Sequence, residues 1–118
     1  MSSELFRVAT ENDVHVIDLI LPDALDAAEF DHLNESLLGV IQGKTEGPWV
    51  LDLAQASYMG SAVLGLMVNI RQQIKQSQGK LVLCNLSQRM AEVFRACSLE
   101  RLFIIEQSRA AAIRNAGN

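Results

Sequence analysis

The chain has few of the residue types on which catalytic and secreted proteins depend. Its 118 residues include two cysteines and two histidines, and aromatic residues make up 5% of the chain. No apolar run approaches the ~20 residues that a membrane-spanning helix needs, and the N-terminus lacks the basic start and apolar run of a signal peptide. We therefore expect a cytoplasmic protein that is not inserted in a membrane.

The cysteines and histidines do not form a recognisable site. Cys84 and Cys97 have the spacing of neither a CxxC redox pair nor a zinc site, and both follow apolar residues, so we expect buried, reduced thiols. For His15 and His32, a solvated surface histidine is a simpler interpretation than a metal or acid–base role. Phosphate-binding and nucleophile-elbow motifs are absent from the sequence. We expect no metal, no cofactor and no enzymatic activity.

Two aspartates in apolar strands are the remaining candidates for chemistry. Asp18 and Asp52 each interrupt or end such a strand, and a close approach between them would perturb their pKa values. Carboxylates that anchor loops are the simpler interpretation. An enzyme that uses these aspartates or a thiol is the weakest of three functional hypotheses.

Charge is divided unevenly along the chain. The net charge is −4, but residues 1–60 carry eleven acids against two bases, whereas residues 61–118 carry three acids against eight bases. A dipolar surface of this kind orients a protein partner, and it lacks the basic stripe with interleaved aromatic residues that nucleic-acid binding requires. A well-solvated surface with chance clustering explains the same counts. We expect a protein partner and no nucleic acid.

Length and composition predict a single α/β domain over residues 1–118. A chain with 49% apolar and 20% charged residues is typical of a globular protein that buries a core without disulfides. Apolar periodicity predicts the order ββαβαβαβα, which requires a mixed sheet with one antiparallel edge pair. The predicted strands are residues 5–12, 14–21, 49–56 (the central one), 81–85 and 102–106, and the predicted helices start at Asp26, Ser61, Ser87 and Ser108.

The segment VLDLAQASYMGSAVLGLMVNI, residues 50–70, carries an apolar strand, a short loop, and a serine at the start of an apolar helix. It resembles the STAS family, which includes the anti-sigma factor antagonists of bacteria and whose loop typically reads Asp-Ser-(Ser/Thr)-Gly-Leu. LILPDALDAAEF and KLVLCNLSQRMAEVFRACSLERLF are similar to the family's first strand, loop and helix and to its later strand, helix and Leu-x-x-Leu-Phe close. The resemblance covers nearly the whole chain, and it implies a STAS-type mixed sheet with about four to five helices.

The resemblance also implies a site and a partner. By the family's pattern, a partner kinase phosphorylates Ser61, and the unphosphorylated protein binds this anti-sigma factor kinase and thereby frees a sigma factor. A serine at a helix N-terminus suits that use, because a phosphate there meets unpaired backbone N–H groups and the positive end of the helix dipole. We expect a monomer or a weak dimer, since an exposed hairpin edge leaves self-pairing open. The implied partner-binding residues are Asp26, Tyr58, Met59, Gly60, Ser61, Ala62, Val63 and Leu64.

Three residues depart from the family's loop. Gly60 replaces the acid, Ala62 the second hydroxyl and Val63 the glycine, and β-branched Val63 makes the turn less permissive. The alternative is a constitutive STAS scaffold or regulatory subunit, for example of a transporter ATPase or a signalling assembly, in which Ser61 only caps its helix and contributes about 1 kcal/mol. The neighbouring hydroxyls of Ser57 and Tyr58 are interpreted as a turn residue and a partly buried aromatic.

Overall fold

The fold alternates strands and helices in the predicted order. A computed structural model describes residues 5–44, 46–57 and 60–118. A short 3-10 helix before the last strand is the one element of this part of the chain that the prediction did not include. The elements are β1 (Phe6–Glu11), β2 (Val14–Leu19), α1 (Ala27–Ile41), β3 (Pro48–Asp52), α2 (Ser61–Gln76), β4 (Lys80–Cys84), α3 (Gln88–Ala96), the 3-10 helix (Leu99–Arg101), β5 (Ile104–Glu106) and α4 (Arg109–Ala116).

The strands form one mixed sheet in the order β1-β2-β3-β4-β5. β1 and β2 pair antiparallel, and each later pair is parallel. The turn between β1 and β2 places Asn12 and Asp13 at φ values of 53° and 64°, a left-handed backbone that these two residue types tolerate in tight hairpins. The predicted antiparallel edge pair and the central position of β3 are confirmed.

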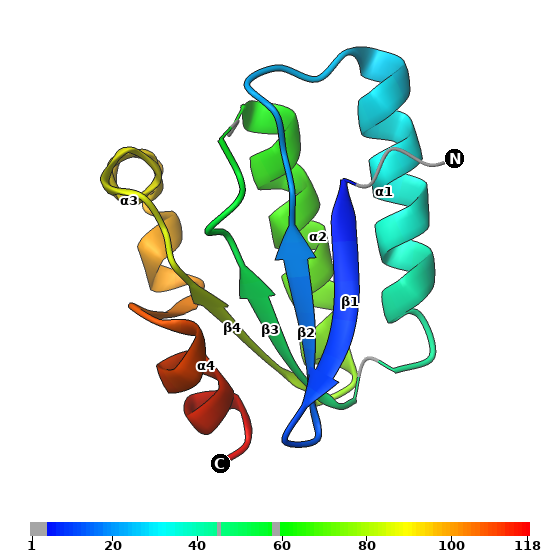
Figure 1. Ribbon diagram of the computed structural model, residues 1–118, viewed down its shortest axis with the longest axis vertical. Coiled ribbons are helices and arrows are strands. Elements are labelled where there is room, and N and C mark those ends of the chain that lie inside the picture. The colour runs from blue at the N-terminus through cyan, green and yellow to red at the C-terminus, as the bar shows by residue number, and fades with distance from the viewer. Residues whose placement is uncertain (1–4, 45, 58–59) are drawn as a thin grey trace.

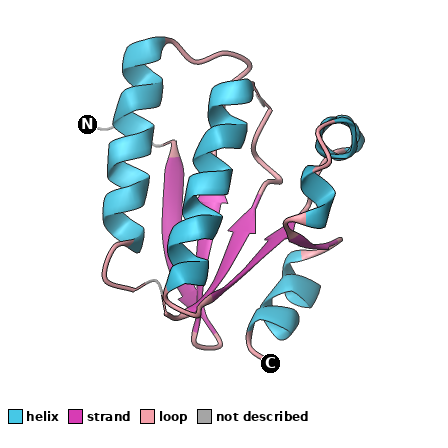
Figure 2. Ribbon diagram, turned by 180° about the vertical axis from the view of Figure 1, so that it is seen from behind, coloured by secondary structure: helices cyan, strands magenta, loops and turns pink. Residues whose placement is uncertain are grey.

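Helices cover both faces of the sheet. Figure 1 views the sheet with α1 and α2 behind it, and Figure 2 shows the same two helices in front of it. On β3, Trp49 and Leu51 face the α1–α2 layer, whereas Val50 belongs to a smaller core with Ala112 and Ile113 of α4. β3 is apolar at successive positions because its two faces pack into different cores, as expected for a parallel strand covered on both faces.

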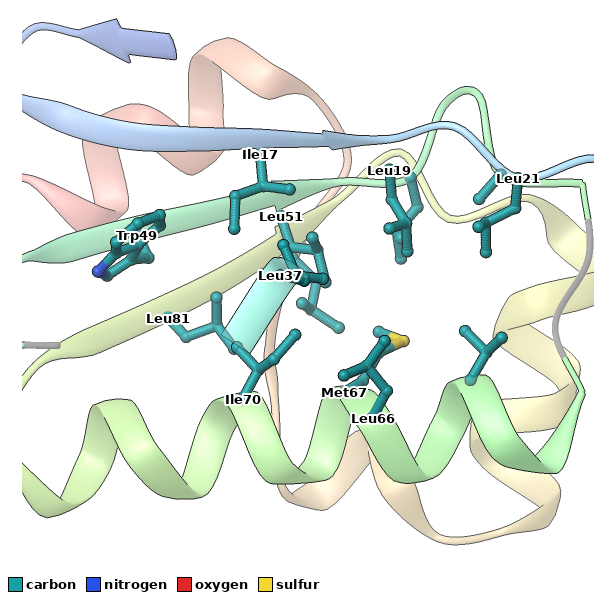
Figure 3. Packing of buried hydrophobic residues seen from close by; sticks show 14 of the residues in the cluster. Ile17, Leu19, Leu21, Leu37, Trp49, Leu51, Leu66, Met67, Ile70 and Leu81 are labelled. Atoms are coloured by element: carbon teal, nitrogen blue, oxygen red, sulfur yellow. The ribbon is translucent and has the colours of Figure 1, made fainter. Parts of the chain in front are cut away.

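The larger core lies between the sheet and α2 (Figure 3). Ile17 and Leu51 of the sheet face Leu66 and Ile70 of α2, and all four side chains are at most 2% exposed. Burying an aliphatic side chain of this size contributes about 1.5–3 kcal/mol. The helix is thus held by its buried face, largely independently of its first residues.

Four of the five predicted strands are shorter than expected, and in β3 and β5 a local interaction explains the difference. The strand predicted over residues 49–56 ends at Asp52, because the Asp52 carboxylate accepts the Ala54 N–H at 3.0 Å and turns the chain. The strand predicted over residues 102–106 begins only at Ile104, because Leu102 still caps the 3-10 helix that follows Ser98 and donates its N–H to the Leu99 carbonyl at 2.9 Å.

The two cysteines differ in environment. Cys84 is buried in the smaller core, as predicted. The prediction for Cys97 was wrong, because this residue is the C-cap of α3 and is exposed. None of the helices in the described ranges combines the length and apolar character needed to cross a membrane.

Candidate functional site

The loops that follow β2 and β3 lie side by side at one end of the sheet. Leu21 donates its N–H to the Gln55 carbonyl at 3.1 Å, and Ser57 donates its N–H to the Leu21 carbonyl at 3.0 Å. Because β2 and β3 are parallel, their carboxyl ends lie at the same end of the sheet. These bonds therefore extend the pairing of the two strands into the loops that follow them. The arrangement brings the start of α1 and the start of α2 to the same end of the molecule (Figure 1).

Ser61 is the first residue of α2, and it is exposed. The N-cap is Gly60, with a φ of −85°, and it provides no side-chain hydrogen bond. Within the described ranges the Ser61 hydroxyl has no hydrogen-bond partner. The interpretation of Ser61 as the cap of its helix was therefore wrong, and its hydroxyl is accessible.

The start of α2 differs from the starts of the other three α-helices in the described part of the chain. Asp26 caps α1 by accepting the Glu29 N–H at 2.8 Å, and Glu29 in return accepts the Asp26 N–H at 3.0 Å. Ser87 and Ser108 cap α3 and α4 by accepting backbone N–H groups, each at 3.1 Å. α2 has neither a side-chain cap nor an acidic residue in its first turn. Its positive dipole end and first N–H groups are thus left for solvent or a ligand.

The other predicted partner-binding residues differ in accessibility. Ala62 is exposed and Leu64 is half-buried, while Val63 is fully buried beneath them. Because Val63 lies inside the helix, its β-branched side chain does not restrict the turn, contrary to the expectation from the sequence. Tyr58 and Met59 lie outside the described residues.

Two open depressions flank the start of α2. The first, of about 520 Å³, lies toward α3 and is lined by Asp23, Ser57, Gly60, Ser87, Arg89, Met90 and Val93. The second, of about 220 Å³, lies toward α1 and is lined by Leu25, Asp26, Ala27, Phe30, Asp31 and Ala62. The contribution of α3 was not predicted, although the parallel neighbours β3 and β4 must deliver their following helices to the same edge.

Asp18 and Asp52 do meet, and a cation lies between them. They are opposite each other in the β2–β3 ladder. Arg109 donates from Nη1 to Asp18 Oδ1 at 2.6 Å and to Asp52 Oδ2 at 3.1 Å, and from Nη2 to Glu11 Oε2 at 2.5 Å. Glu11 and Arg109 were not predicted, although two adjacent carboxylates on neighbouring strands are stable only with a cation nearby.

The Asp52 carboxylate also has neutral partners. Its Oδ1 accepts the Ala54 N–H and the Asn85 side-chain amide, both at 3.0 Å. The described residues contain no group of three or more His, Cys, Asp or Glu side chains arranged to hold a metal ion. The cluster thus ties α4 and the loop after β3 to the sheet, which agrees with the loop-anchoring interpretation.

The cluster shifts the pKa values of its neighbours. The hydrogen bond from Arg109 lowers the pKa of Glu11 below its usual 4.5, and the same bond raises the pKa of Arg109. Burial, reinforced by the charge of Asp52, raises the pKa of the Cys84 thiol to about 12. A thiol in that state is protonated near neutral pH and is a poor nucleophile.

The histidines contribute to packing and to the surface. His32 is exposed on α1, as predicted. His15 was predicted to be a solvated surface residue, but it is half-buried and its ring lies 4.6 Å from the Trp49 ring, centroid to centroid. Neither side chain belongs to the depressions beside α2.

The structure is thus an α/β domain with a mixed five-stranded sheet, helices on both faces and an accessible serine at an uncapped helix start. The STAS domain family model matches residues 7–112. The chain is 32% identical over 96 residues to the anti-sigma-B factor antagonist of Listeria monocytogenes, covering 81% of this chain and 83% of that one. It is 34% identical over 92 residues to BtrV of Bordetella bronchiseptica, covering 78% of each chain. The protein belongs to the STAS family, and its resemblance to anti-sigma factor antagonists is confirmed.

Solved structures show the same fold. A STAS-domain anti-sigma-factor antagonist from Planctomyces limnophilus superposes with a TM-score of 0.83 at 24% identity, covering 96% of this chain and 98% of that one. SpoIIAA of Bacillus, solved in its phosphorylated form, superposes with a TM-score of 0.67 at 19% identity, covering 92% and 97%. At these identities the superpositions establish the fold alone.

Proposed function

We propose that this protein is an anti-sigma factor antagonist that binds an anti-sigma factor kinase through the start of α2 and is released when Ser61 is phosphorylated. The name of the Listeria relative and the phosphorylated form of SpoIIAA support this role. The observation that carries the proposal is the exposed Ser61 at the uncapped start of α2. As such a regulator the protein acts in the cytoplasm, as a monomer or a weak dimer.

A phosphate on Ser61 fits the local backbone. It adds a charge of about −1.5 to −2 at neutral pH, beside N–H groups that no side chain caps and with no acidic residue in the same turn. A negative charge at a helix start is stabilising by about 0.3–1 kcal/mol. The folded domain therefore accepts the phosphate without rearrangement, and its effect falls on the partner.

The partner surface is formed by the start of α2 and the two depressions beside it. Half-buried Leu25 and Phe30 offer apolar contact on the α1 side, next to Asp26, while Arg89 lies on the α3 side.

A partner bound across both depressions covers Ser61. Phosphorylation then forces the partner to desolvate a charged group without a matched cation, which weakens binding. Gly60, Ala62 and Leu64 belong to the proposed surface, and buried Val63 supports it from below. Tyr58 and Met59 lie outside the described residues, and their assignment as partner-binding residues rests on the resemblance of the sequence alone.

Phosphorylation can be tested with purified components. The protein is incubated with ATP and with each candidate anti-sigma factor kinase of the same organism, and its intact mass is measured. We expect the addition of one phosphate, which Ser61→Ala abolishes. Ser57→Ala is the matched control, because Ser57 is a second exposed hydroxyl of the same loop, and this variant should still accept the phosphate. A phosphate that persists in Ser61→Ala would contradict the proposed site.

Binding to the same kinase tests the switch. Calorimetric titrations compare the wild type with Ser61→Ala, Ser61→Asn and Ser61→Asp, where Asn matches the size of Asp without its charge. We expect Ser61→Asp alone to bind at least tenfold more weakly, with thermal denaturation showing that each variant is folded. Equal binding by all four proteins would favour the constitutive scaffold, a function consistent with the absence of an acid at Gly60 and of a hydroxyl at Ala62.

A further inference from the structure

The sheet ends in an exposed apolar edge far along the chain from Ser61. Leu102, Ile104 and Ile105 are 39%, 42% and 37% exposed. β5 is the last strand in the sheet and pairs only with β4, so its outer edge has no strand partner in the described ranges. An edge of this kind is a template to which an extended segment of another protein can add as a further strand.

A groove of about 300 Å³ lies beside this edge, between the C-terminal half of α2 and β5. Ile74, Leu81, Leu102 and Ile104 form its apolar lining, and Arg71, Lys75, Gly79 and Lys80 form the rest. The groove therefore has two cationic side chains, Arg71 and Lys75, and no acidic one, in a chain whose net charge is −4. Lys80 borders the groove, but its side chain points to the other face of the sheet, where its ammonium donates to the Asn115 carbonyl of α4 at 2.7 Å. This local excess of positive charge selects an anionic occupant.

One of the two cations is held in position by a backbone carbonyl, since Arg71 donates from Nε to the Leu102 carbonyl at 2.5 Å. A guanidinium has five N–H donors, so this bond uses only part of the donor capacity of Arg71. A side chain fixed in this way loses little conformational entropy when it binds a carboxylate.

We propose that this groove binds an extended, acidic and apolar segment of a second partner protein, which lies beside β5. Its carboxylates pair with Arg71 and Lys75, and its apolar side chains cover Leu102 and Ile104. A nucleic acid fits the groove less well, because the lining has no aromatic side chain on which a base could stack. An isolated anion would leave the apolar lining exposed.

The groove and the Ser61 surface lie at opposite ends of α2. Ser61 begins this 16-residue helix, and Lys75 follows fourteen residues later, about 21 Å along the axis. Two partners can therefore bind at the same time, one at each end of the helix. This second site is additional to the proposed function and does not depend on it.

Synthetic peptides test the groove directly. The probe is a fluorescent peptide of alternating Asp and Val residues, followed by anisotropy at low ionic strength and by amide NMR of the labelled protein. We expect saturable binding that shifts the amide signals of residues 71–81 and 102–106. Peptides in which Lys replaces Asp, or Ser replaces Val, should bind at least tenfold more weakly, because each removes one of the two interactions.

Matched variants locate the site. Lys75→Glu should weaken binding of the Asp–Val peptide about fivefold, whereas Lys44→Glu, which reverses an exposed charge in the loop after α1, should not change it. Ser61→Asp should bind the peptide as the wild type does. A negative result for the groove can therefore be distinguished from a negative result for the kinase switch. Signal changes confined to the start of α2, tighter binding of an RNA oligonucleotide, or self-association that covers the groove would each overturn the proposal.

Discussion

Replacing Arg109 with methionine removes the cation that holds α4 to the sheet. The substitution keeps much of the aliphatic length of the side chain and leaves the three carboxylates of Glu11, Asp18 and Asp52 together without it. We expect a clear loss of stability, because the Asp52 carboxylate stays buried without its ion-pair partner.

The size of the loss follows from the exposure of the partners. The side chain of Asp52 is 5% exposed, that of Asp18 22% and that of Arg109 30%. Removing one partner of a fully buried ion pair costs about 3–5 kcal/mol, and an exposed pair is worth at most about 1 kcal/mol. Asp52 keeps its bonds from Ala54 and Asn85. We therefore expect a loss of about 2 kcal/mol, which lowers the melting temperature by about 8 °C in a domain of this size.

Chemical and thermal denaturation at pH 7 measure this loss. Arg114→Met is the matched control, because Arg114 is an exposed arginine of the same helix, and it should change stability by less than about 0.5 kcal/mol. The double variant Arg109→Met with Asp52→Asn should lose less than the sum of the single variants, since it no longer buries an unpaired charge. The reasoning fails if Arg109→Met is as stable as Arg114→Met, or if the two substitutions are additive.

Three further predictions concern single side chains. Because the pKa of Cys84 is about 12, only about 10⁻⁴ of this thiol is thiolate at pH 8. Iodoacetamide should therefore label only exposed Cys97 in the native protein and both thiols in guanidinium, and mass spectrometry that finds native Cys84 labelled would contradict this. Because Arg109 lowers the pKa of Glu11 below 4.5, that ion pair stabilises the fold above pH 4.5 and is lost as the pH falls through the lowered pKa. The difference in stability between the wild type and Glu11→Gln should be present at pH 7 and vanish in acid. Asp26→Ala should cost about 1 kcal/mol in denaturation because Asp26 caps α1, whereas Ser61→Ala should cost less than half of that, and equal losses would mean that Ser61 is a cap after all.

Features encoded by neighbouring residues could be predicted from the sequence. The caps Asp26, Ser87 and Ser108 each act on a backbone N–H three residues away, so the local pattern contains the whole interaction. The apolar run at residues 49–53 likewise indicates a central parallel strand, because both of its faces need cover. Ser61 is proposed as the site because its surroundings in the sequence resemble the STAS family.

Features that depend on long-range contacts could not be predicted. Arg109 and Glu11 are 98 residues apart in sequence, and only the sheet topology and the position of α4 bring them together. The exposure of Cys97 depends on where α3 ends. The alternative interpretation made Ser61 a cap because serine favours that position, but the helix begins one residue earlier than that interpretation requires, with Gly60 as its N-cap. A shift of one residue decides whether the hydroxyl is used by the fold or is accessible.

The difference between α2 and the shorter helices explains why such a serine can be left accessible. α3 and α4 have nine and eight residues, lengths at which an isolated helix is marginal and a cap matters. α2 has sixteen residues and buries Val63, Leu66, Met67, Ile70 and Ile74, so packing rather than capping determines its stability. A change of charge at Ser61 therefore has little effect on folding and acts mainly on whatever binds there, which is the property that a phosphorylation switch requires.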